Sequence, residues 1–141
     1  MNMITLYQIE YTKEMIDFLN SRPEGGWTNA MKKYPMIHAD MTAKHEGSEA
    51  WLPEFFQHYR AVANIKADTL ADAWGIGNAF GGLHTDMVDQ GLLEPLLPYV
   101  KLKNCHETVH MHSMSVGDIC KMNDEYYLCE SFGWAKVEVN D

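Results

Sequence analysis

Three short β-strands are predicted by the segment His112-Ser-Met-Ser-Val-Gly-Asp-Ile-Cys-Lys-Met-Asn-Asp-Glu-Tyr-Tyr-Leu-Cys-Glu-Ser-Phe-Gly-Trp-Ala-Lys-Val-Glu-Val139. They are Ile119–Met122, Glu125–Glu130 and Ala135–Val139. Asn123 and Asp124 tolerate the left-handed backbone of a tight hairpin turn, and Gly133 removes the steric penalty at the second reversal. The segment therefore predicts a C-terminal β-hairpin with a third strand beside it.

Two earlier segments also have the composition of strands. Residues 4–11 are rich in β-branched and aromatic residues, and their apolar and polar side chains alternate for most of the segment. Residues 58–67 also have the pattern of a strand. In the second segment a regular strand would place a shared set of side chains on one face. That set is Tyr59, Ala61, Ala63 and Ile65.

Helical spacing of apolar residues occupies most of the remaining chain. Thr12 is expected to cap a helix, and Thr85 or Asp86 to cap another that runs to Leu93. Residues 36–43 fit a helical turn or a short extended piece, and residues 96–102 are expected to pack on the core. The order of elements predicts an α+β fold in a single domain over residues 1–141. We expect a small, mostly antiparallel sheet with helices on one face and a C-terminal β-hairpin. Helical spacing is predicted over residues 13–19, 27–34 and 70–77.

Charge and composition exclude several classes of function. The 141 residues carry a net charge of −9, and residues 105–141 contain seven acidic and two basic residues. Nucleic-acid binding needs a basic face, so direct binding to DNA or RNA is not expected. The negative charge instead predicts a protein partner with a basic surface. No apolar run approaches the roughly 20 residues of a membrane helix. Three cysteines without an export signal indicate free thiols and a cytoplasmic setting.

A cluster of metal-ligating side chains invites a zinc hypothesis. Zinc needs about four converging ligands. The tight turn would place Cys120 opposite Tyr127, with Cys120 and Cys129 on the same face. His106 and His110 have the spacing H-x3-H, but Cys105 is adjacent to the first of them and no C-x2-C pair frames the cluster. We therefore expect surface histidines, small apolar cysteines and no bound metal. The candidate ligands are Cys105, His106, His110, His112, Cys120 and Cys129.

Other chemistry-bearing patterns have structural explanations. Residues 74–82 contain G-x-G but lack the full dinucleotide fingerprint, so helix packing followed by a helix end is expected and no cofactor is predicted. His84 with Asp86, and His112 with Ser113 and Ser115, lack any recognised catalytic motif and are interpreted as cap and turn residues. An enzyme or ligand-sequestering protein using the histidine–cysteine cluster or a pocket near the glycines stays open as the alternative.

Parts of the chain resemble small proteins of unassigned function carried by tailed bacteriophages. The resemblance lies in Leu6–Thr12, Tyr59–Asn78, Met114–Ile119 and Cys129–Trp134, and its most specific elements are Ser-Val-Gly-Asp and Ser-Phe-Gly-Trp. The resemblance implies a phage or prophage source and the cytoplasm of an infected bacterium. By analogy it implies an accessory protein that binds and blocks a host defence system of the anti-restriction or anti-CRISPR type.

These arguments converge on a protein-binding surface in the acidic C-terminal third. Aromatic side chains beside acidic ones suit such a patch, and exposed hairpin charges can attract a basic partner. Residues 51–56 and the turn at residues 75–82 are the second choices for an interface. The residues predicted to contact the partner are Asp118, Asp124, Glu125, Tyr127, Glu130 and Trp134.

Overall fold

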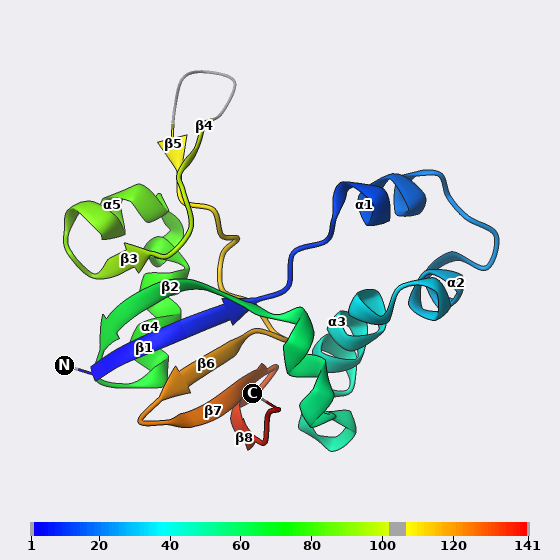
Figure 1. Ribbon diagram of the computed structural model, residues 1–141. Helices are drawn as coiled ribbons and strands as arrows, with labels where there is room; N and C mark the ends of the chain where they lie inside the picture. The colour runs from blue at the N-terminus through cyan, green and yellow to red at the C-terminus, as the bar shows by residue number, and fades with distance from the viewer. Residues whose placement is uncertain (1, 102–106, 141) are drawn as a thin grey trace.

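A six-stranded antiparallel sheet carries the C-terminal hairpin at one side (Figure 1). It is seen in a computed structural model that describes residues 2–101 and 107–140. The strand order is β3-β2-β1-β6-β7-β8, so the first strand of the chain lies inside the sheet. The predicted α+β class is confirmed. The strands are β1 (Asn2–Gln8), β2 (Arg60–Ala67), β3 (Leu93–Pro95), β6 (Ile119–Met122), β7 (Glu125–Glu130) and β8 (Gly133–Val137).

The β6–β7 hairpin has the predicted register. Asn123 and Asp124 adopt φ angles of 54° and 65°, as a two-residue turn with both residues left-handed requires. Cys120 consequently lies opposite Tyr127. At the other end of β7 the chain reverses through Ser131 and Phe132, and β8 begins at Gly133, whose φ is 125°.

Strand β2 departs from regular alternation at Val62. Leu6 of β1 pairs with Ala63 and Tyr7 pairs with Ala61, so Val62 is the extra residue of a β-bulge. Val62 then joins Ala63 and Ile65 in the core. The prediction of one face shared by residues 59, 61, 63 and 65 is therefore wrong, because the bulge resets the alternation between Ala61 and Ala63.

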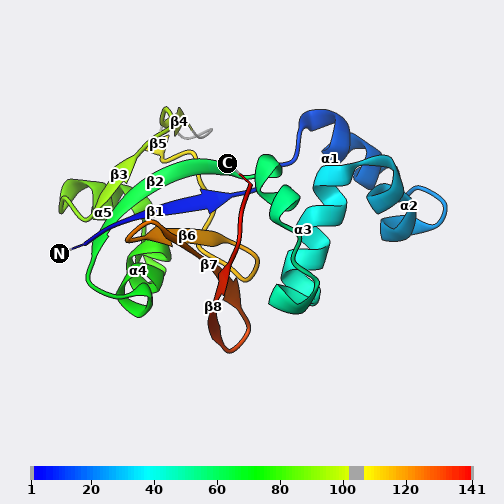
Figure 2. The same cartoon turned by 60° about the horizontal axis from the view of Figure 1, so that its bottom comes forward.

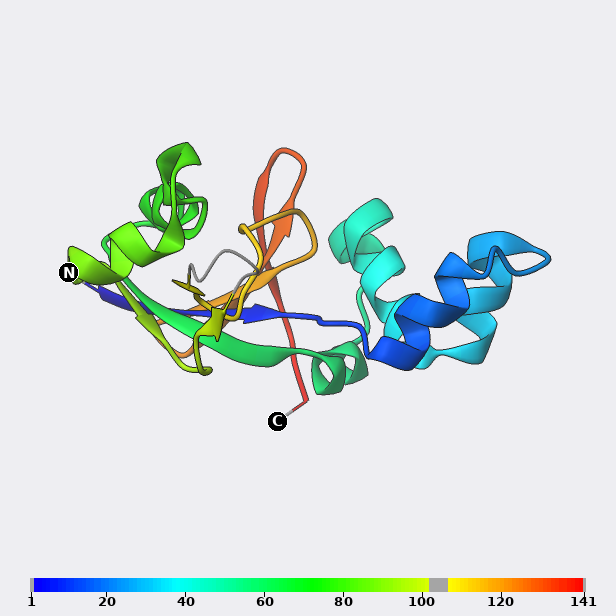
Figure 3. The ribbon, with the colours of Figure 1, turned by 90° about the horizontal axis from the view of Figure 1, so that it is seen from above.

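Helices α4 (Leu70–Gly77) and α5 (His84–Asp89) lie on one side of the sheet (Figure 3). Buried residues of β1, β2 and β6 form the main core with them. Gly77 is needed for this packing, because a Cβ there would lie 2.7 Å from Cε of Met114. A short 3₁₀ helix, η3 (Ala79–Gly81), follows α4.

Three helices extend beyond the end of β1, away from the sheet (Figure 1). Thr12 caps the first of them as predicted, accepting a hydrogen bond from the Met15 N–H over 3.2 Å. Residues 36–43, whose sequence fits either a helical turn or a short extended piece, are helical. These helices share their own core around Ala30, Tyr34 and Ile37. They are α1 (Lys13–Asn20), α2 (Gly26–Lys33) and α3 (Pro35–His45).

The opposite face of β6, β7 and β8 is covered by the aromatic segment that follows α3. Trp51, Phe56 and Tyr59 pack there on a cluster that includes Ile119, Leu128 and Val137. The Trp51 indole N–H donates to the Glu138 carbonyl oxygen over 2.7 Å. Residues 51–56, one of the two second choices for an interface, are thus mostly used inside the fold, although Leu52 is exposed. Two 3₁₀ helices belong to this segment, η1 (Gly47–Ala50) and η2 (Pro53–His58).

The segment after α4 differs most from the prediction. Helix α5 ends at Asp89, and Leu93 belongs to β3, where it pairs with Ile65. Thr85 does not cap α5, because the helix already begins at His84. Leu96, Tyr99 and Val100 are exposed, although Leu97 does pack on the core. Residue 102 lies outside the described residues. Strands β4 (Val100–Lys101) and β5 (Glu107–Thr108) form a separate small sheet.

No helix within residues 2–101 and 107–140 combines the length and the apolar character needed to cross a bilayer.

Candidate interaction surfaces

Three of the predicted partner-binding residues share one face of the outer strands. Glu125 and Tyr127 are two residues apart on β7, and Trp134 of β8 lies opposite Cys129. The Tyr127 hydroxyl donates to Oε2 of Glu125 over 2.6 Å, and Lys136 Nζ lies 3.1 Å from Oε1 of the same carboxylate. Asp124 is exposed in the turn at the end of this face. We call Asp124, Glu125, Tyr127, Trp134 and Lys136 the hairpin face.

The charges of the hairpin face are partly balanced within it. The hydrogen bond from Tyr127 and the contact with Lys136 lower the pKa of Glu125, and hydrogen bonding to Glu125 raises the pKa of Lys136. Both groups therefore stay ionised at neutral pH and compensate one another. The net negative charge of the face comes from Asp124, which is exposed in the β6–β7 turn, while Trp134 lies near the other end of β7.

Asp118 does not belong to this face, contrary to the prediction. Its side chain is buried, with the residue only 3% exposed. Its Oδ2 accepts hydrogen bonds from Nε2 of Gln8 and from the Ser115 N–H, each over 2.9 Å. Burial raises the pKa of Asp118 to about 6, against the opposing effects of His112 and these hydrogen bonds. Asp118 thus holds the connector before β6 against β1.

Glu130 is also separated from the hairpin face. Alternation along β7 places it on the opposite side of the sheet from Glu125 and Tyr127. Its Oε2 accepts a hydrogen bond from the Ser48 N–H over 2.8 Å, and it fills the space beside Gly47. The role of Glu130 is to attach η1 to the end of β7, so the six predicted residues do not form one surface.

The proposed metal ligands are dispersed among different partners. Cys120 and Cys129 do share a face, but both are buried free thiols whose pKa burial raises, in the case of Cys129 to about 12. His110 Nε2 lies 2.7 Å from Glu10 Oε2, and the His112 N–H donates to Gln8 Oε1. No group of three potential metal ligands forms among residues 2–101 and 107–140. Cys105 and His106 lie outside the described residues.

The glycine-rich segment and the suggested catalytic pairs have structural partners. His84 Nε2 donates to the Gly77 carbonyl oxygen over 2.7 Å, which joins α5 to α4. The Ser115 N–H donates a hydrogen bond to Oδ2 of Asp118. The Phe80 ring lies over Gly75, where a Cβ would be 2.6 Å from Cε1 of that ring. Helix packing followed by a helix end therefore explains this segment.

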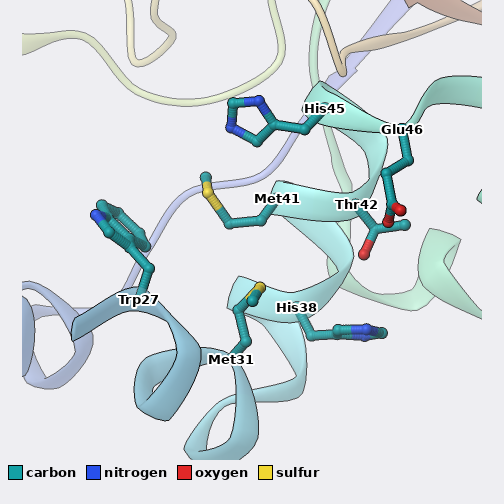
Figure 4. Close-up of a pocket in the computed structure, with 7 residues that line it drawn as sticks. All are labelled: Trp27, Met31, His38, Met41, Thr42, His45 and Glu46. Carbon is teal, nitrogen blue, oxygen red and sulfur yellow. The ribbon is translucent and has the colours of Figure 1, made fainter. Parts of the chain in front are cut away.

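Sequence reasoning missed a groove between α2 and α3 (Figure 4). It has a volume of about 580 Å³ and walls rich in apolar atoms. Trp27 is 51% exposed, whereas its predicted helix-face neighbours Ala30 and Tyr34 are buried. The helical spacing does not predict that Trp27 is exposed while Ala30 and Tyr34 are buried, because this difference depends on how α3 packs against α2. The groove is lined by Trp27, Met31, His38, Met41, Thr42, His45 and Glu46.

A second hollow adjoins this groove at the C-terminal end of α3. It has a volume of about 270 Å³ and shares His45 and Glu46 with the α2–α3 groove. Phe132, on its rim, is 104% exposed and is the most exposed of the large apolar side chains. No family model, curated protein or solved structure matches the chain, so functional inference starts from these surfaces.

Proposed function

We propose that this chain is a phage-encoded accessory protein that binds and inhibits a host protein in the bacterial cytoplasm. The target class that we propose is a defence system of the restriction or CRISPR type. The observation that carries the binding proposal is the hairpin face, where Tyr127, Trp134 and the Glu125–Lys136 pair share one side of the outer strands and the exposed Asp124 stands at one end. Aromatic side chains with a polar rim are the common anchors of protein interfaces.

The charge of the whole chain supports a basic partner. At −9 the protein attracts positively charged surfaces over distances of about a Debye length, roughly 8 Å at physiological salt. Such attraction raises the association rate more than it lowers the dissociation rate. The partly balanced Glu125–Lys136 pair adds specificity, because it sets one cationic and one anionic position beside Tyr127.

A charge-altered variant of the hairpin face tests the proposal. Asp124 has a φ of 65°, which asparagine tolerates better than lysine, so the variant combines Asp124→Asn with Glu125→Lys. Expressed in bacteria that carry a defined restriction or CRISPR system, the wild-type chain should restore plating of a targeted phage. The double variant should lower that protection at least tenfold while keeping a native circular dichroism spectrum.

The matched control carries the same charge change on α5, which contacts β3 at the edge of the sheet opposite to β8. Asp86→Asn with Asp89→Lys alters two exposed residues of α5 and should leave the protection unchanged. Equal protection by both double variants would remove the hairpin face from the mechanism. Absence of protection by the wild-type chain against every system tested would refute the proposed target class.

A further inference from the structure

We infer that the α2–α3 groove and the hollow beside it together bind an aromatic amine, with a planar ring in the groove and an ammonium group in the hollow. We call this pair of cavities the amine site. Glu130, which lines the hollow, lies on the opposite side of the sheet from the hairpin face. The amine site is consequently separate from the surface proposed for the host partner.

The groove has the chemistry to hold a planar ring. The indole of Trp27, which is 51% exposed, and the thioethers of Met31 and Met41 line it. Figure 4 shows the Met41 side chain extended toward the indole, with Met31 below them. Methionine adapts to the shape of a bound group and makes favourable sulfur–aromatic contacts, and tryptophan favours offset or edge contact with a second ring. An aromatic ring therefore gains contacts there that an aliphatic group of equal size lacks.

The size of the groove indicates a small molecule. Its volume of about 580 Å³ falls within the range of pockets that bind drug-sized ligands. Seven residues line it, whereas a stable protein interface uses roughly 20–30 residues on each side. The hollow adds about 270 Å³, which gives room for a short chain that ends in an ammonium group.

The charges around both cavities favour a cation. Among the described residues that line the groove, Glu46 is the one acidic side chain, and none is a lysine or arginine. Besides His45, the ionisable side chains that line the hollow are Glu46, Glu130 and Lys44. Nζ of Lys44 lies 3.1 Å from Oδ2 of Asp40, so this cation is already balanced. Two carboxylates therefore remain for a bound cation, and a ring that carries a phosphate or carboxylate group would be repelled.

Glu130 is held in place for contact with a cation. Its Oε2 accepts a hydrogen bond from the Ser48 N–H over 2.8 Å, and no residue that the structure describes donates to its Oε1. Figures 2 and 3 show this end of β7 beside the C-terminal end of α3. An ammonium group carries three N–H donors, so it can bond to Oε1 of Glu130 and to Glu46 together. Charge-assisted hydrogen bonds of this kind are roughly twice as strong as those between neutral groups.

The two cavities are joined, because His45 and Glu46 line both of them. Figure 4 shows Trp27 and Glu46 on opposite sides of the groove. A ligand that reaches both side chains therefore needs a flexible chain between its ring and its ammonium group. This requirement separates the inferred ligand from a compact quaternary ammonium ion, which would fill one cavity and leave the other without a contact.

Isothermal titration calorimetry of the intact chain with three probes tests the inference. Naphthylethylenediamine carries the ring and the cation, naphthaleneethanol carries the ring alone, and putrescine carries the cation alone. Naphthylethylenediamine should bind about tenfold more tightly than either of the others, because it alone makes both the ring contacts and the charge-assisted hydrogen bonds. Absence of saturable binding by naphthylethylenediamine, or equally tight binding by naphthaleneethanol, overturns the inference.

Two substitutions separate the contribution of the ring from that of the cation. Glu46→Gln should weaken the binding of naphthylethylenediamine about tenfold, because it removes one charge, and should leave the binding of naphthaleneethanol unchanged. Trp27→Ala should weaken the binding of both probes. The matched controls are Glu49→Gln, at an exposed acid of η1, and Trp74→Ala, at a 39% exposed indole of α4, and both should bind like the wild type. Wild-type affinity in both Glu46→Gln and Trp27→Ala would contradict the site.

Methionine methyl signals in nuclear magnetic resonance spectra locate the bound ring directly. In chains labelled at the methionine methyl carbons, naphthylethylenediamine should shift the signals of Met31 and Met41. The signals of Met3 and Met87, which line neither cavity, should stay in place. Shifts confined to other methionines would place the ligand elsewhere and overturn the inference. The double variant of the hairpin face should bind the probe like the wild type, so loss of host protection and failure of the amine site are told apart.

Discussion

At the scale of single residues, Asp118 makes stability depend on pH. Its pKa in the folded chain is about 6, above the ordinary value, so folding favours the protonated form. Its contribution is complete below about pH 4 and is lost as pH rises through 6. The loss amounts to about 3 kcal/mol, since each pKa unit corresponds to about 1.4 kcal/mol. Asp118→Asn removes this titration and keeps an acceptor for the Ser115 N–H.

The stability of Asp118→Asn relative to the wild type should therefore increase between pH 4 and pH 7. Urea unfolding of both proteins at several pH values measures the difference, in which the other titrating groups largely cancel. A difference that stays constant, or that moves in favour of the wild type as pH rises, would show that Asp118 is ionised in the folded chain without cost.

At the scale of elements, the three C-terminal strands complete both faces of the sheet. Cys120 belongs to the main core, and Ile119, Leu128 and Val137 belong to the aromatic cluster on the other side. A chain ended at Met114 loses all four and leaves one side of β1 without its partner strand β6. We expect this shortened chain to lack near-ultraviolet circular dichroism and cooperative thermal unfolding. Retention of both signals would contradict the prediction.

The same elements show what local sequence can and cannot predict. The Asn123–Asp124 turn determines the register of β6 against β7, because both residues favour the backbone that the turn needs. The burial of Asp118 was not predictable, since its partner Gln8 is 110 residues away. The bulge at Val62 was missed for a related reason, because it exists only in the pairing of β2 with β1. The α2–α3 groove likewise depends on the packing of two helices.

At the scale of the whole molecule, net charge should govern the rate of partner binding. With the purified nuclease or effector complex against which protection is found, the association rate should fall steeply as salt rises, because the Debye length falls from about 10 Å at 0.1 M to about 3 Å at 1 M. The dissociation rate should change little. Surface plasmon resonance at several salt concentrations measures both rates, and an association rate independent of salt would refute electrostatic attraction to a basic surface.

The position of β1 inside the sheet also has a consequence for synthesis. Gln8 at its end meets Asp118 only after 110 further residues have been added, which takes roughly 6–20 s at bacterial rates of translation. During that interval the β6 side of the strand presents unpaired backbone groups, which invite pairing with other nascent chains. Chaperones that bind the growing polypeptide until β6 has been synthesised would therefore lower its tendency to aggregate.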